Sequence, residues 1–203
     1  ADVHDVARGI GLDGRIGRKF LHAGPGFGGS CFPKDTLALV RIAQEAGAPS
    51  RLVETVVAVN DARKSGMSAR VVAACGGSVR GKVIAVLGLT FKPETDDMRD
   101  APSVPIVSRL AEDGAVIRAY DPEGMEQARP LLPASVTYCN DAMDAVAGAD
   151  ALVLVTEWNG FRALAAERLR AAMRGIVVVD LRNVYDPAAI RAAGFADHGV
   201  GRP

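Results

Sequence analysis

The sequence has 203 residues, in which 24 lysines and arginines balance 24 aspartates and glutamates. Zero net charge gives no electrostatic basis for binding nucleic acid or an anionic membrane surface, so neither is expected as a partner. This length can bury the core of one large domain or two small ones, and the lack of a signal peptide or membrane-length apolar stretch predicts a cytoplasmic chain.

The cysteines predict a reducing environment and no metal site. Cys31, Cys75 and Cys139 are odd in number and show no paired spacing, which argues against a disulfide framework. Neither a C-x-x-C nor an H-x-x-H pattern occurs, so no metal is expected. Cys75 ends an apolar helical run and Cys139 follows a short strand, so we expect both to pack in or beside the core.

The first twenty residues predict a helix followed by a turn. Residues 1–7 have the pattern of the end of a helix, which Gly9 and Gly11 terminate. Because the first residue is not Met, we expect a fragment whose N-terminal part is missing. Residues 14–20 form a short basic turn that leads into a glycine-rich stretch.

That stretch, residues 24–35, reads Gly-Pro-Gly-Phe-Gly-Gly-Ser-Cys-Phe-Pro-Lys-Asp. Its glycines permit left-handed turns and a close approach to a ligand. Pro33 suits the first position of a helix, which places Cys31 at a helix N-terminus where the macrodipole favours a thiolate. With Lys34 nearby and the carboxylate of Asp35 within reach, Cys31 is predicted to be a nucleophile beside an acid/base group. The alternative is a small buried cysteine after an ordinary turn.

The glycine spacing also imitates a dinucleotide-binding motif. Gly24, Gly26 and Gly29 match G-x-G-x-x-G, but no hydrophobic strand precedes them. A dinucleotide-binding turn requires that strand, so this match is rejected.

Two helices and a linker follow. Residues 34–46 have apolar side chains at helical spacing and stop at Gly47. A long helix runs from Pro49 to about Cys75 and carries a broad apolar stripe made of Leu52, Val53, Val56, Val57 and Val59. Such a helix packs in a domain core or in a dimer seam. Because residues 76–81 read as a linker, we place the domain boundary there, with a helical dimerisation region at 1–77 and a second domain at 78–203.

The second domain has the pattern of an α/β fold. Strands are predicted at residues 83–87, 115–119, 136–138, 151–155, 176–180 and 195–198. Helices are predicted to fill the gaps between them, including 103–113, 164–173 and 187–193. This alternation predicts a Rossmann-like, doubly wound parallel sheet. Ligands of such sheets lie at the carboxyl ends of the strands, where Lys92 and Arg182 are expected to converge on one crevice suited to a diphosphate. The alternative is that both are surface charges.

Two motifs carry a family resemblance. Residues 26–35, Gly-Phe-Gly-Gly-Ser-Cys-Phe-Pro-Lys-Asp, closely resemble the catalytic-cysteine motif of the UDP-glucose/GDP-mannose dehydrogenase family. Residues 88–103, Gly-Leu-Thr-Phe-Lys-Pro-Glu-Thr-Asp-Asp-Met-Arg-Asp-Ala-Pro-Ser, are similar to the second signature of that family. The resemblance extends over essentially the whole chain, down to residues 199–203.

The resemblance implies an NAD-dependent oxidoreductase that converts a nucleotide-sugar alcohol into the carboxylate in two hydride transfers. Cys31 would add to the aldehyde intermediate as a thiohemiacetal, which is oxidised to a thioester, and Asp35 would act as, or orient, the base for the water that cleaves it. The product would be UDP-glucuronate for polysaccharide synthesis. Because the dinucleotide-binding domain of the family is missing, we expect this chain to be the C-terminal part of the enzyme and inactive alone.

Further residues take their roles from the resemblance alone. The expected cofactor contacts are Lys34 and Arg99. Arg15 resembles an arginine that reaches into the site of the neighbouring subunit, which implies a homodimer through the long helix. The expected substrate contacts are Arg15, Phe20, His22, Gly24, Gly26, Phe27, Gly28, Phe32, Lys92 and Arg182.

The substrate implied is UDP-glucose, because Gly29-Ser30-Cys31 is the UDP-glucose type of the motif, but GDP-mannose dehydrogenases share it. A sugar-nucleotide-binding module without chemistry of its own is a second alternative. A third is a thiol hydrolase or acyltransferase, which needs a histidine partner. Only His22 lies close in sequence to Cys31, and it has no acidic support.

Overall fold

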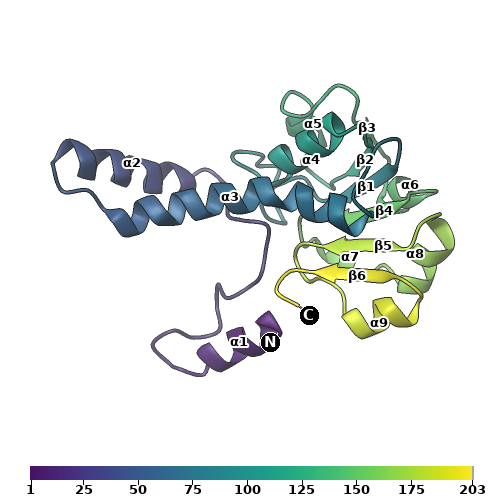
Figure 1. Cartoon of the computed structure of the whole chain (residues 1–203), viewed down its shortest axis with the longest axis horizontal. Coiled ribbons are helices and arrows are strands. Elements are labelled where there is room, and N and C mark those ends of the chain that lie inside the picture. The colour runs from purple at the N-terminus through teal and green to yellow at the C-terminus, as the bar shows by residue number, and fades with distance from the viewer. Residues whose placement is uncertain (203) are drawn as a thin grey trace.

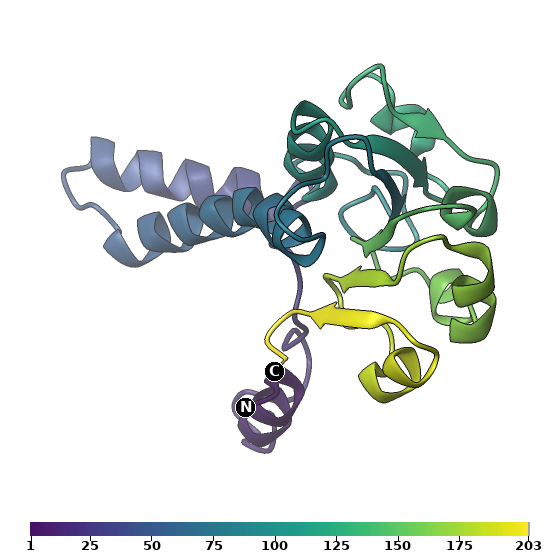
Figure 2. The ribbon, with the colours of Figure 1, turned by 45° about the vertical axis from the view of Figure 1, so that its right-hand side comes forward.

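The computed structural model describes residues 1–202, so Pro203, the last residue of the expected second domain, lies outside the described residues. Figure 1 shows three parts in chain order: a short N-terminal helix, a long helical hairpin and a sheet domain. The hairpin projects away from the sheet domain, as the turned view in Figure 2 confirms. Along the described chain, no helix is long and apolar enough to cross a membrane.

The N-terminal helix α1 (Val3–Ile10) begins where Asp2 accepts a hydrogen bond from the backbone N–H of His4 and ends at Gly11. The predicted helix therefore continues past Gly9. Both chain ends lie side by side (Figure 1), because the N–H of Val3 donates to the carbonyl of Gly201 at 2.7 Å. Residues at the two ends of the sequence are thus joined.

The hairpin consists of α2 (Phe32–Glu45) and α3 (Arg51–Ala74), both close to the predicted bounds. Cys31 is the N-cap of α2, as predicted, and Pro33 is its second rather than its first residue. The outer half of α3 leaves most of the predicted apolar stripe exposed, whereas its second half buries Met67 and Val71 in the sheet domain. The long helix therefore belongs to both parts of the molecule.

The sheet domain has six parallel strands in the order β3-β2-β1-β4-β5-β6, which confirms the doubly wound α/β prediction. The strands are β1 (Val83–Leu87), β2 (Val116–Tyr120), β3 (Thr137–Tyr138), β4 (Ala151–Leu154), β5 (Val177–Asp180) and β6 (Ala196–Gly199). The order reverses between β1 and β4, where such sheets hold their ligands.

Helices cover both faces of this sheet. They are α4 (Ser103–Glu112), α5 (Met125–Ala128), α6 (Ala142–Val146), α7 (Asn159–Arg162), α8 (Ala166–Ala172) and α9 (Pro187–Ala192). The sequence patterns predicted α4, α8 and α9. They gave no bounds for α5, α6 and α7, which lie in gaps where helices were expected, because a helix of four or five residues is too short to show helical periodicity.

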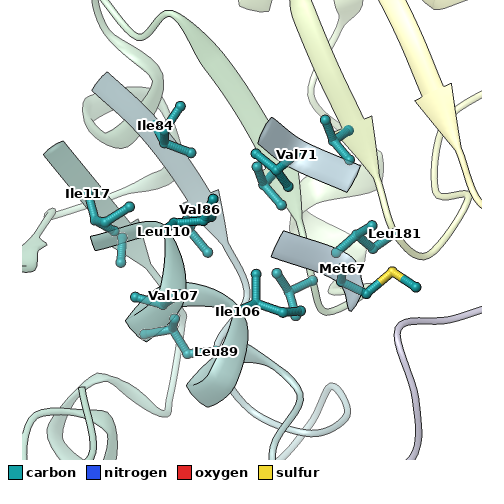
Figure 3. Close-up of a cluster of buried hydrophobic side chains, with 14 of the residues drawn as sticks. Met67, Val71, Ile84, Val86, Leu89, Ile106, Val107, Leu110, Ile117 and Leu181 are labelled. Carbon is teal, nitrogen blue, oxygen red and sulfur yellow. The ribbon is translucent and has the colours of Figure 1, made fainter. Parts of the chain in front are cut away.

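Two hydrophobic clusters flank the sheet, since alternate residues of a strand point to opposite faces. Ile84 and Val86 of β1 belong to the cluster that packs against α3 and α4 (Figure 3), and Ala85 and Leu87 belong to the other. Figure 3 shows Met67 and Val71 of α3 within the first cluster. The inner half of α3 is thereby fixed to the sheet, and it brings its polar residues to the carboxyl ends of the strands.

Candidate functional site

The glycine-rich loop, within residues 24–35, lies against residues 88–103, which are called the second motif below. Two glycines make this contact possible. The N–H of Gly29 donates to the carbonyl of Arg99 at 2.8 Å. A Cβ on Gly28 would lie 2.4 Å from the carbonyl oxygen of Asp100, and one on Gly29, whose φ is 91°, would lie 2.7 Å from the ring of Phe91. Any larger residue at either position would push the two motifs apart.

Helix α3 holds this loop with polar side chains. The side-chain amide of Asn60 accepts from the N–H of Phe27 at 2.8 Å and donates to its carbonyl at 3.2 Å. Arg63 donates from Nε to the carbonyl of Gly24 at 2.8 Å. The loop forms neither helix nor strand. These bonds therefore satisfy backbone groups of Gly24 and Phe27 that have no partner in regular secondary structure.

The first cavity lies between the loop, α3 and the strand ends, and its volume is about 690 Å³, of the size typical of small-molecule sites. Several predicted substrate residues line it: Phe20, His22, Gly24, Gly26, Phe27, Gly28 and Arg182. Sequence reasoning missed the residues that α3 contributes, namely Thr55, Val56, Val59, Asn60 and Arg63. Polar residues at helical spacing within an apolar helix were the available signal.

Arg182 is the cationic wall of this cavity, and its side chain is only 14% exposed. Its Nε donates to the carbonyl of Val155 at 2.9 Å and lies 3.1 Å from a carboxylate oxygen of Glu157. Burial lowers the pKa of Arg182, and the charge of Glu157 opposes that change. A Cβ on Gly24 would lie 2.7 Å from Nη1, so the loop packs directly on the guanidinium.

A second, smaller hollow of about 380 Å³ contains Cys31. Its lining residues are Gly28, Gly29, Ser30, Cys31, Phe32, Phe91, Lys92, Thr95 and Asp97. Cys31 is exposed, whereas Cys75 and Cys139 are buried as predicted. The thiol lies 3.6 Å from the hydroxyl of Ser30.

The two hollows are neighbours, because both are lined by Gly28 and Phe91. Lys92 and Arg182 therefore do not share one crevice: Lys92 lines the hollow of Cys31, and Arg182 lines the first cavity. The reason is Phe91, whose carbonyl accepts from Nη2 of Arg182 at 3.1 Å and whose ring lies 5.3 Å from Nζ of Lys92. A ligand extended across Phe91 would reach both cations.

Three charged side chains that the sequence predicted for the site lie near Cys31 but do not line its hollow. Asp35 lies one helical turn after Cys31, and its carboxylate is 3.3 Å from Nζ of Lys34. Arg99 donates two hydrogen bonds to the carboxylate of Asp97, which lowers the pKa of Asp97 and raises that of Arg99. Asp35, Lys34 and Arg99 are all exposed, so each is accessible from outside the chain.

Besides Lys92, two predicted substrate residues lie apart from the first cavity. Arg15 is exposed and forms an ion pair of 2.6 Å with Asp13, and it lines neither hollow. Phe32 lines the hollow of Cys31 and packs edge-on against Phe27, with 4.6 Å between ring centroids.

Asp121 directly follows β2 and supports the second motif through hydrogen bonds. This fully buried carboxylate accepts hydrogen bonds from the backbone of Leu89 and Thr90, from the indole of Trp158, and from the backbone of Glu123 and Gly124. Dinucleotide-binding sheets direct an acidic side chain near this position to a ribose. Here its oxygens face the protein's own donors.

No group of three or more histidine, cysteine, aspartate or glutamate side chains within residues 1–202 is arranged to hold a metal ion.

Comparison with known proteins adds a family match. Residues 85–187 match the UDP-binding domain of the UDP-glucose/GDP-mannose dehydrogenase family, and residues 1–62 match its central domain. The UDP-glucose 6-dehydrogenase of Rhizobium meliloti is 59% identical over 203 residues, which are 100% of this chain and 46% of that protein. UDP-glucose 6-dehydrogenase TuaD of Bacillus subtilis is 42% identical over 203 residues, 100% of this chain and 44% of that one.

A solved structure is similar over the same extent. The UDP-glucose dehydrogenase from the hyperthermophilic archaeon Pyrobaculum islandicum matches with a TM-score of 0.86 and 37% identity, covering 100% of this chain and 44% of that one. The chain therefore spans less than half the length of the relatives that it matches.

Proposed function

The chain belongs to the UDP-glucose/GDP-mannose dehydrogenase family, and we propose that it is the part of an NAD-dependent UDP-glucose 6-dehydrogenase that carries the sugar-nucleotide site and the nucleophile. In this proposal, residues 1–77 supply the cysteine loop and the dimer contact, and residues 78–203 supply the nucleotide-binding sheet. The family match concerns two domains within this chain, whereas the activity named here would belong to the whole enzyme.

One observation carries the proposal: the single exposed thiol among the described residues opens beside a cavity of nucleotide-sugar size. The hollow of Cys31 and the first cavity share Gly28 and Phe91 as a common wall. In this arrangement Arg182 would neutralise a diphosphate in the first cavity, and the sugar would extend past Phe91 toward Cys31. A non-catalytic binding module would have no use for a thiol at that end.

The sulfur of Cys31 would add to the aldehyde carbon made in the first oxidation while the carbonyl oxygen takes a proton. This gives a thiohemiacetal whose tetrahedral carbon keeps the C–H bond of the aldehyde. Loss of hydride from that carbon and of the hydroxyl proton gives a thioester. Water then cleaves the C–S bond, releasing the carboxylate and the thiol. Asp35, one helical turn after Cys31, would orient or deprotonate that water.

NAD would accept the hydride in both oxidations when bound. The residues of this chain fit a partial contact with NAD, because Lys34 and Arg99 are exposed cations beside the cysteine. They do not fit a complete dinucleotide site, because the carboxylate of Asp121 already accepts hydrogen bonds from the backbone of Leu89 and Thr90. We therefore propose that this chain alone does not turn over.

A homodimer through the hairpin completes the proposal. Large apolar side chains of α2 and α3 are exposed, among them Ile42 at 62% and Leu52 at 84%. An exposed apolar surface of this kind is typical of a protein interface. Arg15, exposed and outside both hollows, would reach a neighbouring subunit on leaving its ion pair with Asp13.

Replacing Cys31 by Ser in the complete enzyme tests the assignment of the nucleophile. The expected result is a fall in UDP-glucuronate formation of at least about a thousandfold, since a hydroxyl is a far weaker nucleophile at neutral pH. Product would be measured by chromatography and UDP-glucose binding by calorimetry. Cys139→Ser, at a buried cysteine outside both hollows, is the matched control. Full product formation by the Cys31 variant would refute the proposal.

A further inference from the structure

Lys64 on α3 is buried close to the site without lining either hollow. Its side chain is only 8% exposed, and its Nζ lies 2.7 Å from a carboxylate oxygen of Asp100 and 3.7 Å from one of Asp61. Burying an ammonium group is unfavourable unless it is paired and hydrogen-bonded. The pair with Asp100 joins positions 36 residues apart, so it fixes tertiary rather than local structure.

Asp100 is where the second motif meets the glycine loop. Its φ of 52° is unusual for a residue other than glycine, so the turn needs support from its surroundings. Its carbonyl contacts Gly28, and the preceding carbonyl, of Arg99, accepts the N–H of Gly29. Cys31 follows Gly29 by only two residues, so a shift of this turn would move the thiol.

We infer that Lys64 is a positioning residue for Cys31. By fixing Asp100, it holds the turn against which Gly28 and Gly29 lie, and so sets the place of the thiol relative to the cations Lys92 and Arg99. Asn60, one helical turn earlier on α3, holds the same loop at Phe27. The inference deepens the proposed function and rests on it for the role of Cys31 as nucleophile.

The position of the thiol is measurable without any ligand, through its preference for anionic reagents. Cations beside a thiol attract iodoacetate but not the neutral iodoacetamide, most strongly at low ionic strength. The ratio of the two alkylation rates at Cys31, identified by peptide mass spectrometry, therefore reports how close the thiol lies to those cations.

Lys64→Met and Asp100→Asn change the local charge in opposite directions but break the same ion pair. If the pair positions the thiol, both variants lower the rate ratio, by at least about threefold. The double variant lowers it no further than either single one, because the same interaction is already lost. Lys64→Arg, which can still pair with Asp100, restores most of the ratio.

Lys82→Met is the matched control. The ammonium of Lys82 is also partly buried, and it donates to the carbonyl of Cys75 at 2.6 Å. Cys75 is the C-cap of α3 and lies away from the cysteine loop in sequence. Its loss is expected to lower the melting temperature without changing the rate ratio. If the rate ratio changed in opposite directions in Lys64→Met and Asp100→Asn, only the local charge would act on the thiol. If the ratio were unchanged in folded variants, Lys64 would have a purely structural role. Either result overturns the inference.

Protection by UDP-glucose separates this inference from the proposed function. In the wild-type protein, bound UDP-glucose is expected to slow alkylation of Cys31 by covering it. Absence of protection would contradict the proposed substrate, whereas the rate ratio without ligand would still decide the role of Lys64.

Discussion

Arg182 connects three segments that are far apart in sequence. Its guanidinium donates to the carbonyls of Val155 and Phe91 and pairs with Glu157, while Gly24 packs against it. Since these bonds fix the side chain before any ligand arrives, little rotamer entropy remains to be lost on binding a diphosphate. A lysine, with one compact charge on a flexible stem, could not make the same contacts.

The strand-end rule predicted Arg182 because Arg182 follows the carboxyl end of β5. Lys64, Asn60 and Asp121 were not predicted in these roles. Their partners lie 31 to 36 residues away in sequence, and no local pattern records such pairs. Sequence reasoning therefore identified cations at strand ends but not the residues that hold the loops.

Asp150 gives a residue-scale prediction on pH. Arg174 donates to its carboxylate, as does the N–H of Val83, and these bonds lower its pKa in the folded protein. The stabilisation is fully present above the unfolded pKa near ~3.9 and is lost as pH falls through the lower folded pKa. Arg174→Gln should lower the melting temperature at pH 7 by at most about 4 °C, because the arginine is exposed.

Melting curves between pH 2 and pH 7 check this. The difference between the wild-type protein and Arg174→Gln should shrink steadily as the pH falls below about 4, because the carboxylate then becomes protonated in both proteins. A difference that stays constant over that range would rule out the ion pair as its source.

At the scale of elements, the docking of the glycine loop on the second motif depends on Gly28. A Cβ there would meet the backbone carbonyl of Asp100 at 2.4 Å, which cannot move aside as a flexible side chain could. Gly28→Ala should destabilise the fold by about 1–3 kcal/mol and weaken UDP-glucose binding, since the loop lines both hollows. Thermal unfolding and calorimetry measure the two effects.

Gly66 provides the matched control within α3. A Cβ on Gly66 would meet no atom within 4 Å. Gly66→Ala should therefore stabilise the helix by about 0.5–1 kcal/mol and leave UDP-glucose affinity unchanged. Equal stability and affinity for Gly28→Ala and Gly66→Ala would contradict the docking described here.

Most elements were predictable because their patterns are long or strongly apolar. The run Val83–Leu87 has no polar residue, and β1 has these bounds in the structure. The bounds of helices α5, α6 and α7 were not predicted, and the start of α2 was displaced by one residue from that implied by Pro33. Element ends depend on caps and on tertiary contacts that the periodicity of a sequence does not record.

At the scale of the whole molecule, the exposed hairpin predicts self-association. Ile42→Glu combined with Leu52→Glu should convert a dimer into a monomer in sedimentation velocity, because charges would replace the apolar contacts. Leu131→Glu, at an exposed leucine of the sheet domain, is the control and should remain dimeric. A wild-type protein that is monomeric at micromolar concentration would contradict the proposed dimer.

Helix α3 takes part in both the hairpin and the sheet domain. Its outer half presents the apolar side chains of the hairpin, and its inner half packs Met67 and Val71 against the sheet (Figures 1 and 3). Between them, Asn60 and Lys64 hold the cysteine loop. The alternation of strands and helices predicted the sheet, but only the structure shows that one helix joins the site to both parts.

The most direct test of the central claim is calorimetric titration of this chain with UDP-glucose, with GDP-mannose and UDP-N-acetylglucosamine as comparisons. The account predicts binding of UDP-glucose in preference to both, lost on replacing Arg182 by Ala but retained on replacing the exposed Arg168. Preference for GDP-mannose would contradict the proposed substrate. Binding that survives the loss of Arg182 would contradict the site itself.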